Sequence, residues 1–577
     1  MKRSLYLAVA MMVVGLLLTS QVLAVPAHPG RMKVRQPDGT TISIRLHGNE
    51  YQHYSTTDDG YTILRNAEGY YVYAIPDGGR LTPSSTIAHD PDGRSASEQA
   101  FLQRISRQAR PSAPTRRSPA IGNSPLRRAI GHSSYNLNKF RGLVILVEFK
   151  DKKFSRPDYN QVANDIFNKP NFIGFLPSDP FPGSVRDYFS DMSDGRFQPQ
   201  FDVVGPVKIK YSQYDANGYE DAWKLTLAAV NAADSRVDFS RYDTDNDRMV
   251  DLIYFIFAGY GSNFAGNDER LIWPHADMVY DIDEAGNYHW VVKDGVYLSD
   301  CACSTELEGW TDEPSTVRLD GIGSICHEFS HVMGLPDFYD VDQEESGGFS
   351  SGPGIWDVMA SGCYGTPVAY SLYERWFMGW AEPQDIDTLG TYTLERLSKN
   401  VGYRLYTPDE SEFFLLENRQ KDDKWNESLP GHGMMVYRVD MTDLQVWDLN
   451  NNSVNCDPSH NYYELLRAKP DIDYDSDYDP FPGRGLVTSL TNYTSPSLRS
   501  WAGKECPLAL INIREENFLI TFDVVDAHSE VGISSPLTGQ QSAPPLIFTP
   551  DGRQVSDMSR PGLYILREGS TTRKVKQ

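Results

Sequence analysis

The sequence has few basic residues and, after its first 24 positions, no long apolar run. Lys and Arg together number 54 against 78 Asp and Glu, which gives a formal net charge of −24. This balance argues against a nucleic-acid partner, because phosphate binding requires clustered Lys and Arg. The missing apolar runs predict that the mature chain has no transmembrane segment. The surplus of carboxylates fits a protein that binds calcium.

Cysteine is also scarce. Only six cysteines are present, and all of them lie between positions 301 and 506. An even number in an exported chain favours disulfides, and we expect Cys456 and Cys506 to pair first; buried free thiols are the alternative. Residues 25–135 contain no cysteine. This region therefore cannot block a metal ion with a thiolate.

The chain begins with the pattern of a secretory signal peptide. Lys2 and Arg3 precede an apolar stretch at residues 5–18, and Val22-Leu23-Ala24 offers a small-residue cleavage site. The stretch is short for a membrane span, although a membrane anchor is the alternative interpretation. We therefore expect a secreted protein, either extracellular or attached to the outer surface.

Composition changes several times along the chain and predicts six segments. Alternating apolar residues at 41–46 and 70–74 indicate short antiparallel strands, and an Arg-, Pro- and Ser-rich stretch beyond them is typical of a flexible linker. The predicted segments are a signal peptide at 1–24, a β unit at 25–104, a basic linker at 105–135, a central domain at 136–390, a β-rich module at 391–525 and a tail at 526–577.

The central domain has the pattern of an α/β fold. Continuous apolar runs at 142–149 and 252–258 are expected of strands that are buried on both faces. Helical patterns at 183–192 and 219–233 lie between these runs. Strands that alternate with helices in this way predict a sheet covered by helices.

The strongest motif lies in residues 322–340. His327 and His331 are four residues apart, so they project from one face of a helix. Two imidazoles on adjacent turns can bind one zinc ion at about 2.0–2.1 Å. Glu328 lies beside that metal but off the ligand line, which suits a general base acting on zinc-activated water.

The residues after this motif predict a third ligand. Gly334 can adopt positive φ and end the helix, so the chain can turn back toward the metal. Asp337 then offers a carboxylate, an accepted zinc ligand; the alternative is a capping role at the helix end. The competing third ligands are Glu344, Glu345 and Glu374.

Met359 follows His331 in Gly-rich surroundings. Metzincins place a methionine in a tight turn beneath the zinc site, and Met359 fits this Met-turn, although a lone methionine is usually plain core. Tyr364 is a candidate for binding substrate or polarising its carbonyl; a packing role is the alternative.

Several motifs together resemble the immune inhibitor A family of bacterial metallopeptidases. They are HEFSHVMGLPDFYD from His327, WDVMASG from Trp356, YER from Tyr373, VRDYF from Val185 and IWPH from Ile272. The resemblance covers about residues 140–525. It implies a metzincin-like α/β zinc peptidase domain, with a mixed sheet and an active-site helix, followed by a C-terminal β-rich module.

The resemblance also implies roles for individual residues. His327, His331 and Asp337 would be zinc ligands and Glu328 the base of a secreted metalloendopeptidase that acts on protein or peptide substrates. Ser330 stands where the family usually has glycine, off the ligand face. Two alternatives remain, a secreted adhesin that keeps the fold and a zinc hydrolase of non-peptide substrates.

An Asp-rich loop precedes the second apolar run and predicts a calcium site. The spacing resembles an EF-hand loop, but Arg248 replaces the glycine at its sixth position and Tyr254 replaces the final glutamate. A solvated acidic turn is the alternative. The candidate ligands are Asp243, Asp245, Asp247 and Asp251 through side chains and Met249 through its carbonyl. A second acidic cluster, for which calcium and a solvated loop are both open, is Asp471, Asp473, Asp475, Asp477 and Asp479.

Both ends of the chain resemble parts of exported proteins. The β unit at 25–104 resembles the propeptide of related secreted proteases, which an activating protease would release at the linker. Latency would then rest on an Asp, a His or steric cover, because no cysteine is present there. The tail at 526–577 resembles the C-terminal sorting domain of the type nine secretion system and implies contact with that machinery.

Overall fold

The computed structural model describes two compact units, Met1–Ala527 and His528–Gln577. The predicted signal peptide before residue 23 and most of the predicted linker lie outside the described residues. The described residues are 23–28, 31–49, 53–66, 68–77, 80–110, 139–176, 179–218, 220–264, 268, 270–309, 318–342, 346–350, 352–409, 411–449, 451–472, 475–528, 546–548, 554–555, 563–568 and 571–576.

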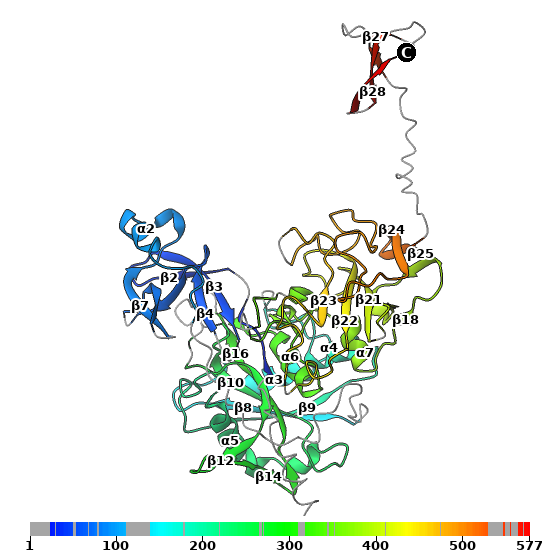
Figure 1. Ribbon diagram of the computed structural model, residues 1–577. Coiled ribbons are helices and arrows are strands. Elements are labelled where there is room, and N and C mark those ends of the chain that lie inside the picture. The colour runs from blue at the N-terminus through cyan, green and yellow to red at the C-terminus, as the bar shows by residue number, and fades with distance from the viewer. Residues whose placement is uncertain are drawn as a thin grey trace, which may run out of the picture. The chain divides into compact units, whose positions relative to one another are not determined.

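A seven-stranded mixed sheet forms the centre of the first unit (Figure 1). Its path runs β1-β11-β16-β10-β8-β9, and β17 pairs with β16. β9, β8, β10 and β16 are parallel, whereas β11, β17 and β1 run antiparallel to their neighbours. The strands are β1 (Leu23–Ala24), β8 (Arg141–Glu148), β9 (Gln200–Lys208), β10 (Ile253–Tyr260), β11 (His275–Met278), β16 (Asp300–Glu308) and β17 (Arg318–Leu319).

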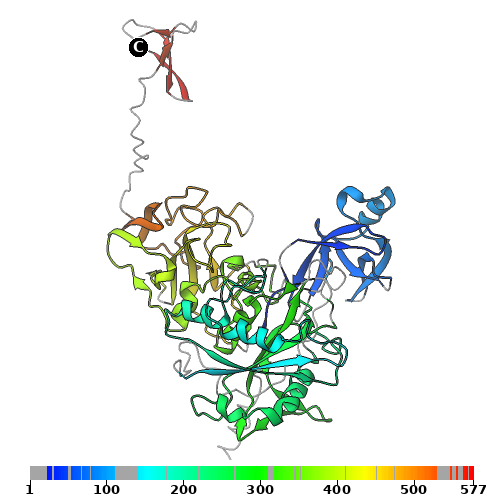
Figure 2. The same ribbon diagram turned by 180° about the vertical axis from the view of Figure 1, so that it is seen from behind.

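Helices cover both faces of this sheet, as the apolar runs predict (Figure 2). Alternate residues of β8 enter different cores: Leu143 packs in the cluster that contains α5, and Val144 in the cluster that contains the other helices. β8 and β10 are almost wholly buried, which explains their unbroken apolar sequence. The helices are α3 (Tyr159–Asn168), α4 (Val185–Met192), α5 (Ala222–Ala233) and α6 (Gly323–Val332).

Local capping fixes where two helices begin. Ser184 and Asp187 form a capping box at the start of α4, and Ser371 and Glu374 form another at the start of α7 (Leu372–Phe377). Each box satisfies backbone N–H groups that a helix start leaves without partners. The helix predicted at 183–192 therefore begins at Val185, two residues after Gly183.

The N-terminal part of the first unit is a six-stranded antiparallel sheet in chain order from β2 to β7. It contacts the central domain where the Asn49 amide donates to the Val341 carbonyl at 2.7 Å. Its elements are β2 (Met32–Arg35), β3 (Thr41–Gly48), β4 (His53–Thr57), β5 (Thr62–Arg65), β6 (Tyr71–Asp77), β7 (Arg80–Ile87) and α2 (Ala96–Leu102).

The part that follows α7 is rich in β-strands. Two sheets, β18-β20-β21-β22-β23 and β19-β25-β24, enclose a separate apolar core that includes Phe414, Val436 and Phe522. The strands are β18 (Gln384–Asp385), β19 (Gly390–Leu394), β20 (Tyr403–Tyr406), β21 (Glu412–Arg419), β22 (Gly433–Asp440), β23 (Tyr463–Leu465), β24 (Leu508–Glu516) and β25 (Leu519–Asp526).

The remaining elements are short. Two hairpins in the first unit are β12 (Tyr280–Ile282) with β13 (Tyr288–Trp290), and β14 (Val292–Lys293) with β15 (Val296–Tyr297). The second unit contains a four-stranded sheet ordered β27-β26-β28-β29. Its strands are β26 (Leu546–Phe548), β27 (Gln554–Val555), β28 (Leu563–Glu568) and β29 (Thr571–Lys576).

The cysteines differ from the expectation. All six are buried free thiols, so the predicted pairing of Cys456 with Cys506 is wrong. Cys456 packs beside Tyr339 and Val341, whereas the Cys506 thiol lies 3.6 Å from the Tyr406 carbonyl in the other core. Both cysteines lie in the late part of the sequence, but the fold places them in different cores. Within the described residues, no helix has the length and apolarity to cross a membrane.

Candidate metal centre

α6 places the predicted motif in the interior of the domain. His327 and Glu328 are fully buried and His331 is 2 % exposed. The helix ends after Val332 because Gly334 has a φ of 110°, a conformation that suits glycine. The Leu335 amide then donates to the Ser330 carbonyl at 3.1 Å. The chain reverses at this point, as the sequence predicts.

Three ligand atoms meet beside α6. The Nε2 atoms of His327 and His331 lie 2.9 Å apart. The Asp337 Oδ1 atom lies 3.2 Å from the first and 3.3 Å from the second. Ligands at zinc distances in a tetrahedral arrangement are separated by about 3.3 Å. The three separations are therefore those of donors that share one small cation.

The hydrogen bonds behind the imidazoles fix which nitrogen faces the metal. His327 Nδ1 donates to the Val358 carbonyl at 2.7 Å, and His331 Nδ1 donates to the Leu335 carbonyl at 2.7 Å. A carbonyl only accepts, so both protons are on Nδ1 and both Nε2 atoms present lone pairs. Two lone pairs facing each other beside a carboxylate repel unless a cation lies between them. Two Nε2 lone pairs and a carboxylate that face one point are a donor set that fits zinc.

Asp337 is oriented from the C-terminal module. The Asn452 amide donates to Asp337 Oδ2 at 2.7 Å, and its carbonyl oxygen accepts from the Asp337 backbone N–H at 2.8 Å. The Asp337 side chain is fully buried. Asp337 Oδ1, which faces the imidazoles, has no hydrogen-bond partner among the described residues. No sequence pattern indicated Asn452, which lies over a hundred residues downstream.

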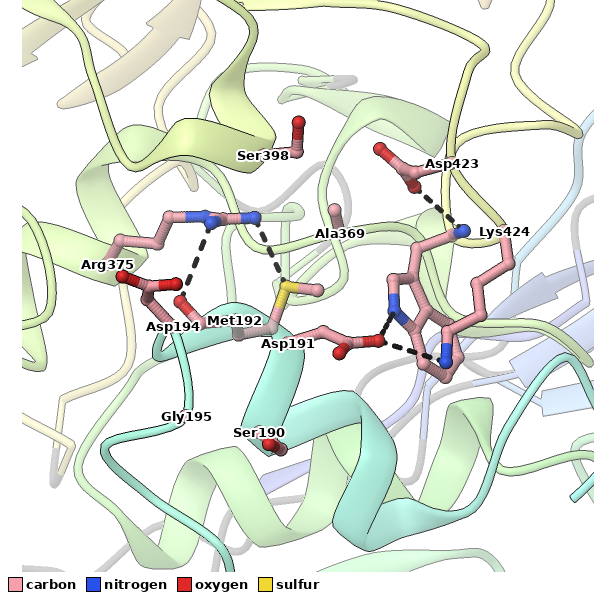
Figure 3. Close-up of a pocket in the computed structure, with 11 residues that line it drawn as sticks. Ser190, Asp191, Met192, Asp194, Gly195, Ala369, Arg375, Ser398, Asp423 and Lys424 are labelled. Carbon is pink, nitrogen blue, oxygen red and sulfur yellow. Dashed lines mark hydrogen bonds and ion pairs between the residues drawn. The ribbon is translucent and has the colours of Figure 1, made fainter. Parts of the chain in front are cut away.

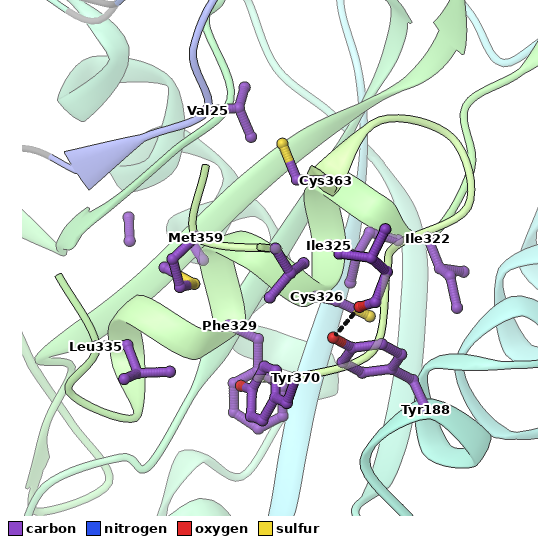
Figure 4. Packing of buried hydrophobic residues seen from close by; sticks show 14 of the residues in the cluster. Val25, Tyr188, Ile322, Ile325, Cys326, Phe329, Leu335, Met359, Cys363 and Tyr370 are labelled. Carbon is purple, nitrogen blue, oxygen red and sulfur yellow. Dashed lines mark hydrogen bonds between the residues drawn. The ribbon is translucent and has the colours of Figure 1, made fainter. Parts of the chain in front are cut away.

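Met359, the candidate Met-turn residue, follows a short 3-10 helix at Gly354–Trp356. Its side chain is fully buried in the cluster that packs around α6, together with Leu335 and Phe329 (Figure 4). Its carbonyl accepts from the Phe338 amide at 2.8 Å. This bond ties the turn to the residue that follows Asp337.

Glu328 contacts the N-terminal segment. The Val25 backbone N–H donates to Glu328 Oε1 at 3.0 Å, and the Trp273 indole donates to the Val25 carbonyl at 2.9 Å. β1, which holds the last two residues of the predicted signal peptide, pairs with β11 just before this point. Val25 itself is fully buried. The segment that follows the predicted signal peptide therefore covers the candidate base.

Tyr364 also contacts this segment. Its hydroxyl donates to the Pro26 carbonyl, and its ring packs edge-on against His28 at 5.0 Å between centroids. Phe264 approaches the same histidine at 5.3 Å. Tyr364 therefore contacts the same N-terminal segment whose Val25 N–H donates to Glu328.

Glu374, the competing third ligand that the structure describes, does not join the centre. Glu374 is buried and its carboxylate accepts from the Ser371 backbone N–H at the start of α7. Burial raises its pKa well above the ordinary value, and the nearby Asp357 raises it further. The structure groups only Asp337 with the two histidines among the described residues. Glu344 and Glu345 lie outside the described residues.

The acidic loop gathers three of its predicted ligands. Carboxylate oxygens of Asp243, Asp245 and Asp247 lie within 4.8 Å of one another. Asp251 instead accepts from the Thr244 hydroxyl, and burial raises its pKa to about 7. Arg248, at the position where an EF-hand has glycine, adopts a φ of 73°. The Met249 amide donates to Asp247 at 2.8 Å.

The second acidic cluster makes protein contacts. Asp479 accepts from the Trp356 indole at 2.9 Å and Asp475 from the Ile355 amide at 2.9 Å. Asp477 pairs with Arg484 at 3.1 Å. Asp475 and Asp479 therefore join the module to the segment that precedes Met359. Asp473 lies outside the described residues.

A pocket of about 490 Å³ lies elsewhere, between α4 and the C-terminal module (Figure 3). Arg375 forms part of its wall and donates to the Met192 carbonyl and the Met192 sulfur, the latter at 3.3 Å. Asp191 pairs there with Lys424 at 3.0 Å. None of the predicted zinc ligands lines it.

Part of the chain is similar to known peptidases. Residues 134–374 match the model of the immune inhibitor A peptidase M6 catalytic domain family. The chain is also 26 % identical over 332 residues to immune inhibitor A of Bacillus thuringiensis subsp. alesti. That match covers 47 % of this chain and spans 44 % of the relative's length. Residues 134–374 are therefore similar to a metallopeptidase domain of the immune inhibitor A type, and the chain spans less than half the length of the relative that it matches.

Proposed function

We propose that this protein is a secreted zinc metalloendopeptidase that hydrolyses internal peptide bonds of extracellular proteins. One observation carries the proposal: two histidine Nε2 lone pairs and Asp337 Oδ1 converge within 3.3 Å beside Glu328. The match to a peptidase domain supports a peptide as the substrate. Neither an adhesin nor a hydrolase of other substrates accounts for that match as simply.

The chemistry follows from the positions of the residues. His327, His331 and Asp337 would hold the metal, and a zinc ion there would polarise the scissile carbonyl and acidify water. Glu328 would take the proton of the attacking water and deliver it to the leaving amine. The buried surroundings strengthen both the charge interactions and the proton transfer, because little water screens them. Tyr364 would contact the substrate backbone once Pro26 has left.

Latency is part of the proposal. The Val25 N–H donates to Glu328 and the Pro26 carbonyl accepts from Tyr364, so this segment would keep a substrate away from both groups. The N-terminal unit would therefore act as a propeptide by steric cover, without a thiolate. Cleavage in the predicted linker at 105–135 by an activating protease would release it. The secretion machinery would recognise the separate C-terminal unit.

Calcium is the second proposed metal. The carboxylates of Asp243, Asp245 and Asp247 converge although their charges repel, and a hard cation would offset that repulsion. The loop also leads directly into β10, which lies at the centre of the sheet. Calcium would therefore stabilise the fold and take no part in the reaction.

The test compares casein cleavage by the wild type, by the wild type after zinc chelation and by Glu328→Ala. Loss of a general base lowers the rate on the order of 10²–10⁴-fold. Zinc content should stay at one per chain in this variant, because Glu328 is no ligand. Unchanged cleavage in the variant would rule out the proposed mechanism. A form that starts at residue 129 should be more active than the full precursor if the N-terminal unit enforces latency.

A further inference from the structure

The N-terminal segment, residues 23–28, runs past the candidate catalytic centre in the manner of a bound peptide. β1 adds to the edge of β11 in the antiparallel direction, so that Ala24 lies opposite His275. The N–H of the next residue, Val25, then meets Glu328. Addition of a strand to a sheet edge is a common way to bind an extended peptide. The segment therefore shows one path that a substrate chain can follow here.

Three side chains of the central domain hold backbone groups of this segment. The Glu328 carboxylate accepts from the Val25 N–H at 3.0 Å. The Trp273 indole N–H donates to the Val25 carbonyl at 2.9 Å, and the Tyr364 hydroxyl donates to the Pro26 carbonyl. All three contacts are made to the backbone, so they do not depend on the side chains that the segment carries. A substrate on the same path could make them too.

Trp273 is covered by the N-terminal unit. Its ring lies 5.0 Å from the His53 ring of β4, measured between centroids, and its N–H donates to Val25. Both partners belong to the part of the chain that the proposed activation would release. Release would therefore leave the indole N–H without the carbonyl that it now binds. A Trp side chain is a donor only, and its N–H usually has a partner when it is buried, so this position favours a new carbonyl.

The Val25 nitrogen marks a place for the leaving amine of a substrate. In the proposed reaction Glu328 delivers a proton to that amine, which requires a separation of roughly 2.6–3.2 Å. The 3.0 Å between Glu328 Oε1 and the Val25 nitrogen meets this requirement. Removal of the predicted signal peptide after Ala24 would also turn this nitrogen into an amine, the group that cleavage of a peptide bond produces. The segment from Val25 onward thus matches the part of a substrate that follows the cut.

We propose, on the basis of the proposed peptidase function, that Val25 and Pro26 occupy the places of the two substrate residues after the scissile bond, and that Trp273 binds the carbonyl group of the first. This bond holds the substrate one residue beyond its leaving nitrogen and so orients the scissile bond at Glu328. Val25 is fully buried in the apolar cluster around α6 (Figure 4). An aliphatic side chain therefore suits the substrate residue that takes its place.

The first test uses two peptides that differ only at this carbonyl. One is acetyl-Gln-Val-Leu-Ala-valinamide, which carries the sequence at 21–25. In the other, isobutylamide replaces valinamide, so the carboxamide after the cut is absent. The full precursor, activated by cleavage at the linker, should cut the valinamide peptide. Trp273→Phe keeps an aromatic ring without the N–H and should lower kcat/KM for this peptide on the order of 10-fold, but by less than about two-fold for the isobutylamide peptide. Trp290 is exposed, and Trp290→Phe is the matched control that should change neither rate.

The second test separates substrate binding from a structural role of Trp273. The same N–H holds Val25 in the uncut precursor. Trp273→Phe should therefore raise the residual casein cleavage of the uncut precursor several-fold while it slows the activated enzyme. Loss of packing alone would slow both forms and both peptides alike.

Three results would overturn the proposal. One is an equal loss of rate for the two peptides in Trp273→Phe, and another is a variant precursor that is no more active than the wild-type precursor. The third is failure of the activated wild type to cut the valinamide peptide although it cuts casein, a readout that needs no variant to fold. Failure of the proposed function looks different, because then casein would also remain uncut.

Discussion

The centre on α6 and the acidic loop before β10 differ in how their carboxylates and imidazoles are held. At the centre, His327, His331 and Asp337 are at most 2 % exposed, and groups outside the site fix each of them. In the loop, by contrast, the Asp243 and Asp247 carboxylates accept hydrogen bonds from backbone N–H groups of the loop itself. Groups from other elements therefore position the side chains of the centre, whereas the loop's own backbone positions the carboxylates of the loop.

This difference predicts different responses to loss of a metal. A site whose ligands are positioned by strands and by a second module keeps its geometry when empty, so its metal serves chemistry. A loop with repelling carboxylates at the surface keeps its geometry poorly without a cation, so its metal serves stability.

The largest expected effect comes from removing one ligand at each site. Asp337→Ala should lose bound zinc and lower casein cleavage about 1,000-fold, because metal polarisation is worth several kcal/mol of transition-state stabilisation. Asp245→Ala should keep zinc and keep activity within about two-fold at room temperature. Zinc analysis and initial rates measure both. Equal losses in the two variants would abolish the distinction.

The next effect tests the support from the C-terminal module. Asn452→Ala removes the amide that orients Asp337, and loss of such an outer partner lowers metal affinity about 10–100-fold. Competition with a zinc chelator measures this change. Asn451, one residue away, donates to the Gln445 carbonyl instead, so Asn451→Ala is the matched control. Equal zinc affinity in both variants would show that the module does not orient the ligand.

A smaller effect should appear as a dependence of calcium stabilisation on pH. Burial raises the pKa of Asp251 to about 7 from an ordinary value near 3.8. Without calcium, this group stabilises the fold fully below about pH 4, and that contribution is lost as the pH rises toward 7. Calcium should restore it by favouring the ionised carboxylate. The gain in Tm on adding calcium should therefore be larger at about pH 8 than at about pH 5.5, as calorimetry can measure.

The smallest effect concerns Arg248. Its φ of 73° is unfavourable for a residue with a side chain, and glycine would relieve that strain. Arg248→Gly should stabilise the protein by up to about 1 kcal/mol, measured by denaturant unfolding. Arg248→Ala keeps the backbone strain and is the control. A stabilisation of equal size in the alanine variant would assign the effect to the lost positive charge.

The sequence predicted the parts of this molecule that depend on local spacing. Four-residue spacing placed His327 and His331 on one face, and Gly334 predicted the reversal that brings Asp337 back. Apolar runs predicted β8 and β10 because buried parallel strands have no polar face.

Contacts between distant segments were not predictable in the same way. Nothing in the spacing of Asn452 or Val25 indicates that they contact Asp337 and Glu328, since both contacts depend on how separate segments pack. Cys456 and Cys506 are an example in which the sequence suggested a contact that the fold does not make. Both lie late in the chain, which suggested a disulfide, but they are buried in two different cores.

The pairing of β1 with β11 has a consequence for handling a form of the protein from which the predicted signal peptide has been removed. Among the described strands, β1 is the last on its side of the sheet, and it holds the last two residues of the predicted signal peptide. Removal of that peptide would leave the outer N–H and C=O groups of β11 unpaired. An open strand edge is a template for any extended chain. Concentrated preparations of the processed protein should therefore associate with themselves through β11, unless a competing peptide occupies that edge.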